Sequence, residues 1–160
     1  GIEKIIKEQS LIKAYKDGKD KEARWNMMMA STEGAMAFSK GLGAVHSMSH
    51  AIGANQDLRL HHGTLNAVIL PSVLRFNQDH VGNKYSRIAR AMGDSESINL
   101  ANEIEKLNEK IGMPIGLSEM GVTEDMIPEL IAHAMTDPSN ITTPRVPTPE
   151  EWEKLFLESM

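Results

Sequence analysis

The sequence lacks cysteine altogether, and this and other shortages exclude several classes of protein. Without cysteine, the 160 residues form neither a disulfide framework nor a thiolate metal site, so histidine or carboxylate side chains must hold any metal ion. No run of about 18 apolar residues is present, so no segment is expected to span a membrane. The net charge of −5 gives no basic surface for nucleic acid. With no secretory signal pattern at its start, the sequence predicts a cytoplasmic protein.

Apolar residues recur at helical spacing along almost the whole chain. No segment shows the alternating pattern of a half-buried strand, so the sequence predicts an all-α fold. Residues 1–160 are expected to form a single helical bundle domain of about eight helices. Within the helix predicted for residues 19–38, a stripe of large apolar residues is expected to face the core, namely Trp25, Met28, Met29 and Met36.

Two short segments mark helix ends. Gly41-Leu42-Gly43 should break the helical pattern and let neighbouring helices approach closely. Thr148-Pro149-Glu150-Glu151 has the composition of a capping box, with a hydroxyl at the N-cap and a carboxylate three residues later. The last helix is therefore expected to begin at residue 149.

Four of the six histidines gather in residues 46–62. His46 and His50 are four residues apart, so on a helix both imidazoles lie on one face. A catalytic metal site needs at least three protein ligands, and either His61 or His62 could supply a third. Alternatively, the pair is a hydrogen-bonded or solvated pair of histidines without metal.

The segments around these histidines carry a recognisable two-part pattern. Residues 41–53 read Gly-Leu-Gly-Ala-Val-His-Ser-Met-Ser-His-Ala-Ile-Gly, and residues 62–77 read His-Gly-x-x-Asn-Ala-x-x-Leu-Pro-x-Val-x-Arg-Phe-Asn. This pattern resembles the signature of the iron-containing (group III) alcohol dehydrogenases. The segment from Asp137-Pro138 to Thr148 is similar to the C-terminal part of the same family.

The resemblance implies a fold, an activity and site residues. The family joins a Rossmann-like domain that binds NAD(P) to a helical C-terminal domain of the dehydroquinate synthase-like type that holds a divalent metal. Its members interconvert alcohols with aldehydes or ketones by hydride transfer. By this resemblance, His46 and His62 match metal ligands, whereas His50 matches a catalytic histidine that relays a proton beside the nicotinamide. Residues that bind NAD(P) are not assigned in this chain.

The resemblance also implies what the chain lacks. The family's other two metal ligands, an Asp and a His on an earlier helix, have no counterpart here, nor does the nucleotide-binding domain. The chain is therefore expected to be a C-terminal fragment with an incomplete Fe(II) or Zn(II) site, and to be inactive alone. The face that would meet the missing domain should favour a homo-oligomer.

Two alternatives remain open. The chain could be a non-catalytic helical metal-binding or interaction module with the same fold. It could also resemble the related glycerol dehydrogenases or maleylacetate reductases, although the Gly-Leu-Gly … His-x-x-x-His … His-Gly form favours the alcohol dehydrogenases.

Overall fold

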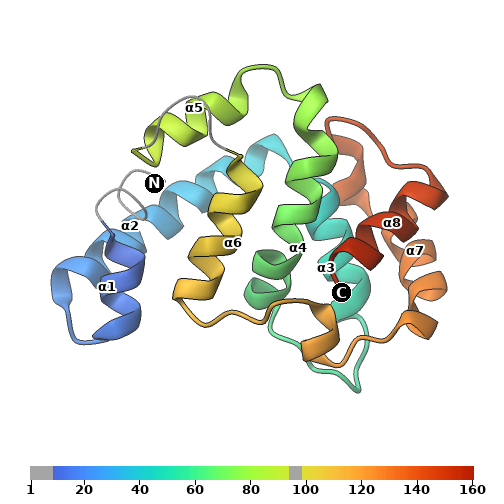
Figure 1. Ribbon diagram of the computed structural model, residues 1–160, viewed down its shortest axis with the longest axis horizontal. Coiled ribbons are helices and arrows are strands. Elements are labelled where there is room, and N and C mark those ends of the chain that lie inside the picture. The colour runs from blue at the N-terminus through green and yellow to red at the C-terminus, as the bar shows by residue number, and fades with distance from the viewer. Residues whose placement is uncertain (1–8, 94–98) are drawn as a thin grey trace. The chain divides into compact units, whose positions relative to one another are not determined.

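The computed structural model describes residues 9–93 and 99–160, and every regular element in these residues is a helix. The all-α prediction is therefore confirmed. The first eight residues of the chain lie outside the described part. The α-helices of the described residues are α1 (Ser10–Lys16), α2 (Lys21–Ala37), α3 (Ala44–Gly53), α4 (His62–Asn77), α5 (Lys84–Ala91), α6 (Leu100–Lys110), α7 (Ile127–Thr136) and α8 (Pro149–Glu158) (Figure 1).

The chain divides into two compact units. The first takes the residues up to Lys40 together with those from Gly82 to Leu100, and the second takes Gly41–Val81 and Ala101–Met160. The first unit therefore holds α1, α2 and α5. The second holds α3, α4, α7, α8 and nearly all of α6, and it contains the histidine cluster. No described helix is long and apolar enough to cross a membrane.

In the second unit, α3 packs against both α4 and α7, and α8 packs against α4 and α7 (Figure 1). The core between these helices consists mainly of aliphatic side chains, and it also contains the aromatic residues Trp152 and Phe156. Its fully buried side chains include Met48, Ile52, Leu65, Ile69, Leu117, Trp152 and Phe156. Burying each such side chain contributes about 1.5–3 kcal/mol, so this core fixes how α3 and α4 meet.

In the first unit, the buried face of α2 is not the one predicted from the sequence. Its buried positions are the small residues Ala23 and Ala30, seven residues apart on one face. Of the large apolar residues predicted to face the core, three are exposed, at 62% for Trp25, 63% for Met28 and 74% for Met36, whereas Met29 is half-buried. Alanine allows close helix packing, so the buried face of α2 is the small-residue face. The large side chains remain on a different side of the helix.

The predicted break at Gly41-Leu42-Gly43 is confirmed, and it brings the start of α3 against a distant segment. Gly41 and Gly43 both have positive φ, 100° and 89°, which glycine adopts without strain. A Cβ at Gly41 would overlap the side chain of Thr142. The N–H of Gly43 donates to the carbonyl of Ser139 at 2.9 Å. Both partners belong to the short 3₁₀ helix η6 (Pro138–Thr142), which is thereby docked beside α3.

The predicted capping box at the start of α8 is also confirmed. The N–H of Glu151 donates to Oγ1 of Thr148 at 3.3 Å, and the N–H of Thr148 donates to the Glu151 carboxylate at 2.9 Å. Arg145 adds an ion pair to the same carboxylate at 2.6 Å, and its guanidinium lies 4.0 Å from the centre of the Phe76 ring. The loop before α8 is thus held to α4.

Candidate metal centre

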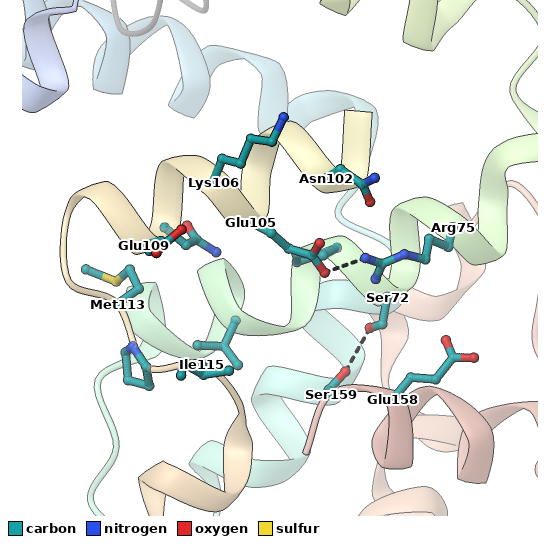
Figure 2. A pocket seen from close by; sticks show the side chains of 14 residues that line it. Ser72, Arg75, Asn102, Glu105, Lys106, Glu109, Met113, Ile115, Glu158 and Ser159 are labelled. Carbon is teal, nitrogen blue, oxygen red and sulfur yellow. Dashed lines mark hydrogen bonds and ion pairs between the residues drawn. The ribbon is translucent and has the colours of Figure 1, made fainter. Parts of the chain in front are cut away.

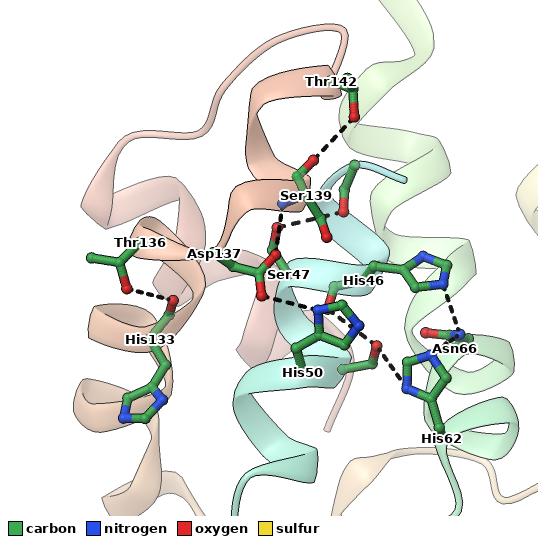
Figure 3. A network of polar contacts seen from close by, with 12 residues as sticks. His46, Ser47, His50, His62, Asn66, His133, Thr136, Asp137, Ser139 and Thr142 are labelled. Carbon is green, nitrogen blue, oxygen red and sulfur yellow. Dashed lines mark hydrogen bonds and ion pairs between the residues drawn. The ribbon is translucent and has the colours of Figure 1, made fainter. Parts of the chain in front are cut away.

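The imidazole rings of His46, His50 and His62, on α3 and α4, lie next to one another in the second unit. The ring centroids of His46 and His62 are 5.3 Å apart, those of His50 and His62 are 5.3 Å apart, and those of His46 and His50 are 5.7 Å apart. His50 and His62 are stacked, with an interplanar angle of 16°. Figure 3 shows the three rings side by side, two from α3 and one from the first residue of α4.

Asn66 links two of these rings. Its Nδ2 lies 3.1 Å from Nε2 of His62 and 3.4 Å from Nε2 of His46 (Figure 3). With Nδ2 of Asn66 as the donor, each Nε2 that it contacts accepts with its lone pair. Both lone pairs therefore point toward the same small region. This is the orientation in which imidazole nitrogens can share a ligand.

Ser49 orients the ring of His62 from the other side. Its buried Oγ lies 3.5 Å from Nδ1 of His62 and donates to the carbonyl of His46 at 3.2 Å. Since the hydroxyl proton goes to that carbonyl, the Nδ1–H of His62 is the donor to Oγ. This places the lone pair of His62 on Nε2, in agreement with its contact to Asn66.

The surroundings favour the neutral form of His46. Burial lowers the pKa of His46 below its ordinary value, and the neighbouring His62 and His50 lower it further, while Asp137 acts in the opposite direction. A neutral imidazole is the form that binds a metal ion. The cluster therefore favours the ligand form of this side chain.

His50 has a separate partner. Its Nδ1 lies 2.9 Å from Oδ2 of Asp137, at the junction of α7 and η6. The side chains of His50 and Asp137 are 40% and 15% exposed, so the histidine borders the surface and the aspartate is more enclosed. Sequence spacing gave no sign of Asp137, which is 87 residues from His50. Its only signal was the similarity of the Asp137-Pro138 segment to the family pattern.

His61 is not part of the cluster. It is the N-cap of α4, and its Nδ1 accepts the N–H of Thr64 at 3.3 Å. The neighbouring His62 is turned toward α3 instead. The sequence alone left His61 and His62 as alternatives. The structure places His61 at the start of α4 as its cap and His62 in the cluster.

The donor set fits a divalent transition metal in part. Two imidazole nitrogens directed at one region suit Fe(II) or Zn(II). A catalytic site needs at least three protein ligands, and no group of three or more histidine or carboxylate side chains in residues 9–93 and 99–160 is arranged to hold a metal ion. His46 and His62 of this chain thus fit as two ligands of a larger set.

A cavity of about 620 Å³ lies elsewhere in the second unit, between α4, α6 and the C-terminal residues (Figure 2). The ion pair of Arg75 with Glu105 and the hydrogen bond between the hydroxyls of Ser72 and Ser159, at 2.7 Å, lie on its wall. Its lining contains no histidine, and both pairs are already satisfied. The cavity is therefore a feature separate from the histidine cluster.

Comparison with known proteins shows what the chain as a whole is similar to. Residues 2–160 match the family described as "Fe-containing alcohol dehydrogenase family, C-terminal". The chain is 44% identical over 155 residues to a 4-hydroxybutyrate dehydrogenase of Cupriavidus necator, covering 92% of this chain and 41% of that protein. It is 38% identical over 146 residues to a lactaldehyde reductase of Escherichia coli K12, covering 86% of this chain and 38% of that protein.

Solved structures share the fold. A 1,3-propanediol oxidoreductase superposes with a TM-score of 0.92 at 31% identity, over 99% of this chain and 43% of that one. An alcohol dehydrogenase from Oenococcus oeni gives a TM-score of 0.90 at 27% identity, over 99% and 43%. The chain thus spans only about two fifths of the length of the relatives that it matches, at 41% and 38% of the first two.

Proposed function

This chain belongs to the iron-containing alcohol dehydrogenase family, and we propose that it is the metal-binding C-terminal part of an oxidoreductase that interconverts alcohols with aldehydes or ketones. The observation that carries the proposal is the convergence of two imidazole Nε2 atoms, from His46 and His62, on the amide of Asn66. The names of the relatives, a 4-hydroxybutyrate dehydrogenase and a lactaldehyde reductase, support a small alcohol or aldehyde as the substrate.

His46 and His62 are the proposed metal ligands of this chain. A bound Fe(II) or Zn(II) would polarise the substrate oxygen and stabilise negative charge on it. Ser49 and Asn66 hold the two rings with their Nε2 lone pairs directed at one region, so little reorganisation is needed when the metal arrives. The remaining ligands come from outside the described residues.

His50 is the proposed proton-relay residue. Oxidation of an alcohol to a carbonyl compound transfers a hydride to NAD(P)⁺ and releases the hydroxyl proton. His50 stacks on His62, so its ring lies beside the proposed ligands. It would take up the released proton on Nε2, because its Nδ1 is engaged by Asp137.

The proposal includes a partner domain. NAD(P) would bind to an N-terminal nucleotide-binding domain of the complete enzyme, and the 160 residues alone would be inactive. The exposed apolar side chains of α2, Trp25, Met28 and Met36, support association into a homo-oligomer. The cytoplasmic location expected from the sequence is part of the same proposal.

Calorimetric titration of the metal-stripped chain with Zn(II), and with Fe(II) without oxygen, tests the ligand assignment. We expect one site whose affinity falls by about tenfold or more in His46→Ala and in His62→Ala, since each substitution removes one of two ligands. His133→Ala is the matched control, because His133 is exposed on α7 outside the cluster, and it should bind as the unmodified chain does.

Equal affinity in His46→Ala, His62→Ala and His133→Ala would contradict the ligand assignment and favour a non-catalytic helical module. A second measurement tests the activity. The chain alone should reduce no aldehyde with NADH or NADPH, and measurable turnover would contradict its dependence on a nucleotide-binding domain.

A further inference from the structure

We propose that Asp137 is a positioning residue for His50, which it holds in the tautomer with the proton on Nδ1 and the lone pair on Nε2. The inference deepens the proposed function and rests on it for the role of His50, but the geometry that supports it involves no metal ion and no cofactor.

Asp137 is itself held at both carboxylate oxygens. It ends α7 and is the N-cap of η6, where its Oδ1 accepts the N–H of Ser139 at 2.7 Å. Its Oδ2 lies 2.9 Å from Nδ1 of His50. The cap therefore fixes the plane of the carboxylate, and the carboxylate in turn fixes the plane of the imidazole.

The hydrogen bond has a defined direction. An ionised carboxylate only accepts, so Nδ1 of His50 must carry the proton of this hydrogen bond. Although burial raises the pKa of Asp137, hydrogen bonds from Ser139 and from His50 outweigh it and hold the pKa below its ordinary value. Asp137 is thus an anion at neutral pH, and it favours a single tautomer of its neighbour.

This tautomer suits the proposed proton relay. Nδ1 and Nε2 lie on opposite sides of the imidazole, and the ring of His50 faces Asp137 on one side and His62 on the other (Figure 3). The basic nitrogen therefore lies on the side of the cluster. The negative charge of Asp137 would also stabilise the imidazolium after it receives a proton, as a buried carboxylate does for a catalytic histidine in general.

The cap at Ser139 makes Asp137→Asn a sharp test. An asparagine can still cap η6, but only if its single carbonyl oxygen takes the position of Oδ1, opposite the N–H of Ser139. Its NH₂ group must then take the position of Oδ2 and donate to Nδ1 of His50. The substitution should preserve the fold while forcing the proton of His50 onto Nε2.

NMR of the ¹⁵N-labelled, metal-free chain reads this tautomer directly from the imidazole nitrogen shifts. Spectra at about pH 8.5, above the ordinary histidine pKa of about 6.5, observe the neutral rings. We expect the Nδ1–H form of His50 in the unmodified chain and the Nε2–H form in Asp137→Asn. Asp79→Asn, which removes an exposed carboxylate of the short 3₁₀ helix η3 (Gln78–His80), should leave the tautomer of His50 unchanged.

An Nε2–H tautomer of His50 in the unmodified chain would overturn the inference, and this result does not depend on how any variant folds. An unchanged tautomer in Asp137→Asn, with the Ser139 amide signal still that of a capped helix, would overturn it as well. The metal titration separates this outcome from failure of the proposed function. Asp137→Asn should change Zn(II) affinity far less than His46→Ala and His62→Ala, which should lower it without changing the tautomer.

Discussion

Gly41 lies against Thr142 so closely that no side chain fits between them. This contact and the hydrogen bond from Gly43 to Ser139 fasten the start of α3 to η6. Because α3 carries His50 and η6 is capped by Asp137, the glycine contact helps to set the distance between those two side chains. A helix break in the sequence thus positions a polar pair of the candidate site.

Gly41→Ala should destabilise the chain by about 2–6 kcal/mol. The substitution adds a residue at positive φ and forces its Cβ into Thr142, and each effect costs about 1–3 kcal/mol. Urea denaturation measures the loss. Gly53→Ala is the matched control within α3, since a Cβ at Gly53 meets nothing within 4 Å. A loss of the same size in both variants would show that contact with Thr142 is not the cause.

Asn66→Asp should tighten Zn(II) binding by about tenfold or more. The aspartate places a carboxylate oxygen where Nδ2 now faces both imidazoles, and carboxylate oxygen is a zinc ligand whereas amide nitrogen is not. Calorimetric titration measures the change. Asn55→Asp adds the same charge outside the cluster and keeps the acceptor for the N–H of Asp57, so its affinity should not change. Weaker binding by Asn66→Asp would argue against a metal between His46 and His62.

Ser49→Ala should weaken Zn(II) binding by about tenfold, the usual effect of removing a group that orients a ligating histidine. Oγ of Ser49 is the acceptor for Nδ1 of His62, and without it the ring can turn away from Asn66. Ser39→Ala removes another serine hydroxyl that bonds to a helical carbonyl, that of Met36, and it should bind zinc as the unmodified chain does. Unchanged affinity in Ser49→Ala would mean that packing alone orients His62.

The contribution of Glu151 to the stability of the chain depends on pH. The N–H of Thr148 and the guanidinium of Arg145 hold the pKa of Glu151 below its ordinary value of 4.5. Above pH 4.5 the Glu151 carboxylate is ionised in both the folded and the unfolded chain. Its full contribution to the free energy of unfolding is then present. As the pH falls, the unfolded chain takes up the proton first, so the contribution is lost as the pH passes through the folded pKa.

The variant Glu151→Gln keeps an acceptor for the capping box but cannot pair with Arg145. The unmodified chain should therefore melt at a higher temperature than this variant at neutral pH, and the difference should shrink below about pH 4.5. Thermal unfolding followed by circular dichroism checks this. Glu153→Gln, at an exposed position of the same helix, should have the same melting temperature as the unmodified chain at each pH. A constant difference down to about pH 3 would contradict the assignment.

The sequence predicted the starts of α3 and α8 well because their signals are local. The glycine break before α3 and the capping box before α8 act within a few residues, and both formed as expected. The buried face of α2 was predicted wrongly, because the stripe of large apolar residues competed with a stripe of alanines that permits closer packing. Periodicity alone does not say which of two such faces is buried.

The candidate site was predictable only where its residues are close in the sequence. Spacing and family resemblance brought together His46, His50 and His62, but spacing did not separate His61 from His62. That distinction depends on the start of α4, where His61 is used as the cap. Asp137 could not be found from spacing, since its distance to His50 depends on the packing of α3 with α7 and on the docking of η6.

The separation of these residues along the chain also determines when the site forms during folding. Ser49 and His62 are 13 residues apart, and Asn66 is four residues beyond His62, so a helical hairpin of α3 and α4 can bring the proposed ligands together by short-range contacts. His50 and Asp137 are 87 residues apart, and closing that loop is slow because its entropy must be lost first. On a ribosome, the proposed ligand pair would therefore assemble before the residue that fixes the proton relay has been synthesised, which makes the relay the last part of the centre to become ordered.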